Sequence, residues 1–116
     1  EIYHIVLEAQ LKSIKGIKAG ASCKAIDTIA RGHITDAGYG KYFDHGLGHS
    51  LGLEIHEDPR FSKVSTDSLK SNYVMTVEPG IYIEDVGGVR IEDDIVVTDN
   101  GCIVLNKTSK DFTVIS

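Results

Sequence analysis

The chain has 116 residues, 41% of them hydrophobic, and a formal net charge of -5. This length and composition are typical of one small globular domain, or part of one. The acidic balance, without a cluster of Lys and Arg, argues against a nucleic-acid-binding surface, and no run reaches the ~18 apolar residues of a membrane span. With no secretory signal pattern either, we expect a cytoplasmic protein without nucleic-acid or membrane partners.

Two helices are predicted first. Apolar residues recur at helical spacing from Glu1 to about Ile17, and Gly20 follows as a helix stop. Ser22 is a candidate amino-terminal cap for a second helix that ends at Gly38, a residue suited to a left-handed exit. The apolar stripe of this second helix comprises Ala25, Ile26, Ile29 and Ala30. Because the first helix is already running at Glu1 without a capping residue ahead of it, we expect the chain to have been cut from a larger protein.

Strands and turns are predicted after Gly38. The β-rich runs Tyr73–Val77 and Ile81–Ile83 flank a break at Pro79-Gly80, and Val89–Val97 is the longest strand candidate. Asp99-Asn100-Gly101 then predicts a hairpin into Cys102–Leu105, because Asn-Gly tolerates the positive φ that such turns require. Helices followed by antiparallel strands indicate an α+β fold, with two helices packed on a mainly antiparallel sheet.

The densest chemical segment runs from His45 to Glu57 and contains three of the five histidines. In an extended segment His45 and His49 would project from the same face, because they are separated by an even number of positions. The glycines between and beside them allow a ligand or metal to approach the backbone. One imidazole could therefore bind a metal while the other binds substrate.

Two later segments supply carboxylates. Glu78 ends an apolar run, where a buried carboxylate is costly unless a cation or donor meets it. Arg90 and Glu92 would share one face of a strand, so the guanidinium could orient the carboxylate and hold it ionised. Together with His49, the two glutamates form a donor set suited to Mn²⁺, Co²⁺, Fe²⁺ or Zn²⁺ and to hydrolysis. Tyr82 could touch substrate, although an aromatic residue in a strand more often serves in packing.

At these residues the sequence resembles the pita-bread family of metallopeptidases, which includes prolidase, Xaa-Pro aminopeptidase, methionine aminopeptidase and the non-metal hydrolase creatinase. The runs Leu-Gly-Leu-Glu-Ile-His-Glu and Gly-Val-Arg-Ile-Glu-Asp are similar to the Xaa-Pro peptidase branch. The resemblance implies the carboxyl-terminal half of a pita-bread (creatinase/aminopeptidase) fold, with a curved sheet. It also implies that the metal ligands of this chain are His49, Glu78 and Glu92.

Further roles follow from the same resemblance. His45 and His56 would bind substrate or stabilise the transition state, Glu78 would also be a candidate proton shuttle, and Arg90 would support the site. The implied activity is that of an exopeptidase that hydrolyses the peptide bond before proline with a metal-activated water. Its substrate would be a peptide with proline in the second position. Two divalent ions would serve it, manganese first, with cobalt, zinc or iron as alternatives.

The resemblance is incomplete in one respect. The family has two further aspartate ligands from an earlier strand pair, and these would lie ahead of Glu1; Asp27 and Asp36 do not match them. Residues 1–116 would thus be the carboxyl-terminal part of a catalytic domain, inactive alone. We also expect a homo-oligomer, because half a sheet exposes an apolar edge.

Two other functions stay open. One is a peptide-binding pita-bread module without catalysis, although retention of all three recognisable ligands argues against it. The other is a creatinase-like hydrolase, which would use the same scaffold without metal.

Overall fold

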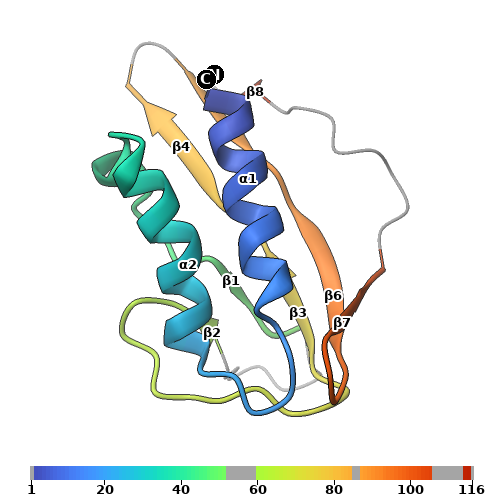
Figure 1. Cartoon of the computed structure of the whole chain (residues 1–116). Helices are drawn as coiled ribbons and strands as arrows, with labels where there is room; N and C mark the ends of the chain where they lie inside the picture. Colours follow the sequence, from blue (N-terminus) through green and yellow to red (C-terminus); the bar gives the residue numbers. More distant parts are fainter. Residues whose placement is uncertain (1, 52–59, 85–86, 106–113, 116) are drawn as a thin grey trace.

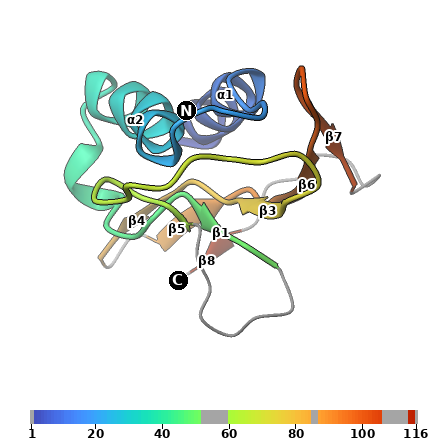
Figure 2. The same cartoon turned by 90° about the horizontal axis from the view of Figure 1, so that it is seen from below.

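The computed structural model describes residues 2–51, 60–84, 87–105 and 114–115. Two helices lie side by side on one face of a curved set of antiparallel strands (Figures 1 and 2). The predicted α+β architecture, two helices on a mainly antiparallel sheet, is therefore confirmed. Within the described residues, neither helix is long and apolar enough to cross a membrane.

The two helices are α1 (Ile2–Lys15) and α2 (Cys23–Asp36). Ser22 caps α2 as predicted, because its hydroxyl accepts a hydrogen bond from the Ala25 amide at 3.2 Å. Gly38 has positive φ directly after the cap of α2, which confirms it as the exit from this helix. Gly20 also has positive φ, but α1 ends earlier, at Lys15, so Gly20 is not its stop. The predicted apolar stripe of α2 is wrong at Ala25, which is exposed. The residues of α2 that face the sheet are Cys23, Ile26, Asp27, Ala30 and Ile34.

The remaining elements are short. They are η1 (Gly40–Tyr42), β1 (Gly48–His49), β2 (Arg60–Phe61), β3 (Val74–Val77), β4 (Gly80–Ile83), β5 (Gly87–Arg90), β6 (Asp93–Val97), β7 (Cys102–Val104) and β8 (Val114–Ile115). Among the described residues, β1 pairs with β2, a second group runs in the order β3-β6-β7, and a third runs β4-β5-β8. Every one of these pairings is antiparallel.

The prediction of one strand over Val89–Val97 is wrong. The chain forms β5, passes through Ile91 and Glu92, and then forms β6 in a different group of strands. At the crossing the Ile91 amide donates to the carbonyl of Pro79 at 3.3 Å, and the Ile91 side chain is buried. The acidic run Glu92-Asp93-Asp94 stands at this break, and such residues are depleted in strands, so the local pattern held a signal of the break but not of the change of partner.

The hairpin between β6 and β7 is confirmed, with Val97 opposite Cys102. The physical reason given for it is wrong, because neither Asn100 nor Gly101 has positive φ. Instead Thr98 closes a longer loop, with its amide donating to the Gly101 carbonyl and its hydroxyl accepting from the Gly101 amide.

The core lies between the helices and the strands. Fully buried side chains from both layers meet there, among them Val6, Ala9, Ile26, Ile34, Phe43, Leu47, Phe61, Met75, Ile81 and Ile95. Strand β1 lies against β3, and a Cβ added at Gly48 would overlap the Thr76 carbonyl oxygen. Only glycine fits at this position, which brings the histidine-rich segment up to the strand that leads to Glu78.

Candidate active site

A cavity of about 350 Å³ opens beside β1, on the part of the chain that carries most of the predicted site residues. Its walls come from four separate segments of the chain. The lining residues are His45, Gly46, Gly48, His49, Arg60, Phe61, Ser62, Glu78, Tyr82 and Arg90. Four of the six predicted site residues, His45, His49, Glu78 and Arg90, are therefore brought to one cavity.

His49 and Glu78 form the centre of this arrangement. The Nε2 atom of His49 lies 3.4 Å from Oε2 of Glu78, and the His49 side chain is 42% exposed against 17% for Glu78. Thr76 fixes both residues: its hydroxyl donates to Glu78 Oε2 at 2.8 Å and accepts from the His49 amide at 2.9 Å. The imidazole and the carboxylate thus converge on one point although they are 29 positions apart.

His45 lines the same cavity through a different set of contacts. Its Nδ1 atom lies 2.6 Å from the Gly46 carbonyl oxygen, and its Nε2 atom lies 3.2 Å from the Tyr82 hydroxyl. The ring of Phe43 packs edge-on against the imidazole, with 4.9 Å between centroids. Of the two roles considered for Tyr82, packing does not describe it fully, because this side chain is half-buried, lines the cavity and contacts His45.

Glu92 is placed differently from the other predicted ligands. It lies in the break between β5 and β6, is exposed, and is not among the lining residues. Partial burial raises the pKa of Glu92, and the nearby charge of Glu78 raises it further, whereas Arg90 and His49 act to lower it. These mutual effects mean that Glu92 is close enough to the other three side chains to share their electrostatic environment.

The donors fit a metal only in part. Among the described residues, no group of three or more His, Cys, Asp or Glu side chains converges closely enough to hold an ion. His49 and Glu78 converge, and Glu92 stands nearby as a third oxygen donor. An imidazole with carboxylates is the donor type of Mn²⁺, Co²⁺, Fe²⁺ and Zn²⁺, and four to six ligands are usual for such ions, so further ligands are required.

The sixth predicted residue, His56, lies outside the described residues, as do Glu54 and Glu57. Two described residues that position the site were missed. Thr76 could have been found, since alternation in the run Met-Thr-Val-Glu puts it on the same face as Glu78. Gln10 could not, because its role depends on contacts across 67 and 81 positions: the buried Nε2 donates to the carbonyls of Val77 and Ile91, each the residue before a predicted carboxylate ligand.

Known proteins share both the sequence and the fold of this chain. The chain is 52% identical over 112 residues to an Xaa-Pro dipeptidase of Pyrococcus horikoshii, covering 97% of this chain and 32% of that protein. The structure matches the prolidase of Pyrococcus furiosus with a TM-score of 0.89 and 53% identity, over 93% of this chain and 32% of the other. It also matches the X-Pro aminopeptidase of Thermotoga maritima with a TM-score of 0.89 and 45% identity, over 95% of this chain and 31% of the other.

The chain thus spans about a third of the length of these relatives. A family model described as metallopeptidase family M24 matches residues 1–99, which include His45, His49, Glu78, Arg90 and Glu92. The resemblance to the pita-bread metallopeptidases is confirmed. The expected fold is confirmed too, because the chain matches the prolidase and X-Pro aminopeptidase structures closely. The chain belongs to metallopeptidase family M24.

Proposed function

We propose that this chain is the carboxyl-terminal part of the catalytic domain of a metal-dependent exopeptidase that cleaves the bond before proline. The observation that carries the proposal is the convergence of His49 with Glu78 in the cavity, at 3.4 Å. The proposed substrate, a peptide with proline in the second position, follows from the similarity to proteins named Xaa-Pro dipeptidase and prolidase.

His49, Glu78 and Glu92 would hold the metal from this chain's side. Bound divalent ions, two in the intact protein and manganese first among the candidates, would supply a water of lowered pKa and a Lewis acid for the scissile carbonyl. Thr76 would keep the Glu78 carboxylate in its orientation, as second contacts to metal ligands commonly do.

The other cavity residues would act on the substrate. Glu78 would accept a proton from the attacking water and pass it to the leaving amine. His45 faces the cavity with an Nε2 atom that now contacts the Tyr82 hydroxyl, and it would donate a hydrogen bond to the developing oxyanion. The positive charge of Arg90 would stabilise the ionised form of Glu92, whose pKa it acts to lower. His56 would contribute to substrate binding.

The chain alone would bind metal weakly and hydrolyse nothing. Its described residues offer two converging donors and one nearby carboxylate, and it spans about a third of its relatives. We propose that two aspartate ligands come from the part of the longer protein that precedes these residues.

The test is hydrolysis of an Xaa-Pro dipeptide by the longer protein in the presence of Mn²⁺, compared with the His49→Ala variant. We expect His49→Ala to abolish hydrolysis. The matched control is His33→Ala, which removes an imidazole of α2 that contacts Glu8 and Lys12 outside the cavity. Retained activity in His49→Ala would overturn the proposal. Hydrolysis without bound metal, established by elemental analysis, would instead favour creatinase-like chemistry.

A further inference from the structure

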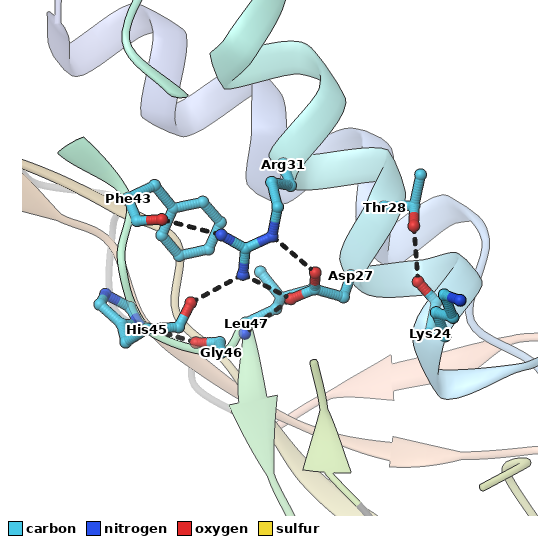
Figure 3. A network of polar contacts seen from close by, with 8 residues as sticks. All are labelled: Lys24, Asp27, Thr28, Arg31, Phe43, His45, Gly46 and Leu47. Carbon is cyan, nitrogen blue, oxygen red and sulfur yellow. Dashed lines mark hydrogen bonds and ion pairs between the residues drawn. The ribbon is translucent and has the colours of Figure 1, made fainter. Parts of the chain in front are cut away.

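Asp27 and Arg31 form a buried ion pair on α2 that faces the histidine-rich segment (Figure 3). Arg31 Nε donates to Asp27 Oδ2 at 2.9 Å, and Nη2 donates to Oδ1 at 3.2 Å. The Asp27 side chain is 0% exposed and that of Arg31 is 19% exposed. An ion pair on a helix surface contributes little, but a buried one is tolerated only where further hydrogen bonds satisfy its polar atoms.

Those further bonds all go to one short segment. Arg31 Nη1 donates to the carbonyl of Phe43 at 2.8 Å, and Nη2 donates to the carbonyl of His45 at 2.8 Å. The Leu47 amide donates to Asp27 Oδ1 at 3.1 Å. The guanidinium also lies over the Phe43 ring, 4.3 Å from its centroid. The pair therefore holds three alternate residues, with His45 in the middle.

The segment needs such partners because residues 43–47 belong to neither a helix nor a strand. Backbone carbonyls that are partly buried must find donors, and no neighbouring strand supplies them to Phe43 and His45 in the described contacts. Arg31 supplies them, since a planar guanidinium can serve a carboxylate and two carbonyls at once. A lysine has no such fork of donors.

Fixing this backbone fixes the cavity wall. The carbonyl of His45 itself is held, and so are the Phe43 carbonyl before it and the Leu47 amide after it, which keeps the imidazole within reach of the Tyr82 hydroxyl. The Leu47 carbonyl in turn accepts from the Glu78 amide at 2.7 Å, which ties the same segment to the backbone of a proposed ligand. The contacts run from α2 through the segment to the site.

We propose that Asp27 and Arg31 are positioning residues that hold His45 in the orientation in which it meets the substrate. The inference rests on the proposed peptidase function. Asp27 does not match a metal ligand of the family, and the inference gives it a different role.

The first test compares Arg31→Lys and Asp27→Asn with the parental longer protein on an Xaa-Pro dipeptide. A misplacement of a catalytic group by about 1 Å can cost about 100-fold in rate, so we expect kcat to fall about 10- to 100-fold. KM and metal content should stay near the parental values, whereas the melting temperature should fall, because a buried ion pair loses hydrogen bonds. Thr28→Ala is the matched control, because it removes a hydrogen bond of the same helix, to the Lys24 carbonyl, outside the network (Figure 3).

A double-mutant cycle separates positioning from a general effect on the fold. If Arg31 acts through His45, Arg31→Lys should lower kcat by less than about 2-fold in a His45→Asn background, where the imidazole is already lost. An equal loss of kcat in both backgrounds would overturn the inference.

A second readout does not depend on peptidase activity. Hydrogen exchange of peptides covering residues 43–51 should become faster in Arg31→Lys, whereas exchange in α1 should stay unchanged. Unchanged exchange in residues 43–51 would show that the pair does not hold the segment. Absence of hydrolysis by the parental protein would count against the proposed function alone, because the exchange result still tests the contacts.

Discussion

The imidazole of His49 lies 3.4 Å from the carboxylate of Glu78. The hydroxyl of Thr76 bonds both residues, because it donates to the Glu78 carboxylate and accepts from the His49 backbone amide. Two strands are needed for this arrangement, because β1 supplies the histidine and the end of β3 supplies the glutamate. The approach of the strands depends on Gly48, where any side chain would strike the Thr76 carbonyl.

Thr76→Val should weaken metal binding by the longer protein about 10- to 100-fold, the usual effect of losing a group that orients a metal ligand. The substitution keeps the branched shape but removes the donor to Glu78 and the acceptor for the His49 amide. Calorimetric titration with Mn²⁺ measures the change. Thr28→Val, at an exposed position of α2, should leave the affinity unchanged; equal affinities in parental protein and Thr76→Val would refute the role of the hydroxyl.

Gln10→Leu should lower the free energy of unfolding by about 1 to 3 kcal/mol, because two buried carbonyls lose their common donor while the side-chain volume barely changes. The carbonyls belong to Val77 and Ile91, so the variant also tests whether α1 fixes the backbone beside both carboxylate ligands. Urea unfolding of the longer protein measures the difference. The neighbouring Leu11→Ala, at a side chain 43% exposed, should cost about 0.5 kcal/mol or less. A Gln10→Leu protein as stable as the parent would contradict the expectation.

The Cys23 thiol should make stability depend on pH in the alkaline range. Burial, with a smaller contribution from Asp67, raises the pKa of this thiol from 9.0 to about 11. Between pH 9 and pH 11 the thiol of the unfolded chain loses its proton, while the thiol of the folded chain keeps it. The unfolded state is therefore favoured as the pH rises. At pH 10 this costs about 1 kcal/mol relative to pH 8.

The measurement is urea unfolding at pH 8 and pH 10 for the parental protein and for Cys23→Ala. Other groups also titrate between these values, and the comparison cancels their contribution. The alanine variant will be less stable at both values, since it loses packing, but its stability should fall less between them. Equal falls in the two proteins would show that the thiol is not responsible.

The sequence predicted those features that depend on a few neighbouring residues. The cap at Ser22, the helix exit at Gly38 and the hairpin after Val97 each have a local physical cause. The meeting of His49 with Glu78 was predicted through family resemblance, because spacing alone does not bring two distant segments together.

What could not be predicted depends on the partners of each segment in space. The run from Val89 to Val97 divides at its acidic residues: the part before them pairs with β4, and the part after them pairs with β3. The composition can suggest the break, but it cannot name these partners. That division separates Arg90, in the cavity wall, from Glu92, in the break, although period-two spacing placed them on one face. The contacts of Gln10 and Arg31 likewise join α1 and α2 to backbone far along the chain, which no local pattern records.

The isolated 116-residue chain should associate with itself. Strand β7 pairs with β6 on one side, and among the described strands nothing pairs with its other side. Ile103 of β7 and Leu105, just after the strand, are exposed, at 55% and 47%. An open edge with apolar side chains is a template for pairing with another chain, and a lysine on such an edge opposes this pairing.

Light scattering should therefore detect oligomers of the parental chain, and Ile103→Lys should shift them toward monomer. Lys24→Ala, at an exposed position of α2, should leave the distribution unchanged. A parental chain that stays a monodisperse monomer would contradict this prediction, and oligomers that Ile103→Lys leaves intact would place the contact elsewhere than β7.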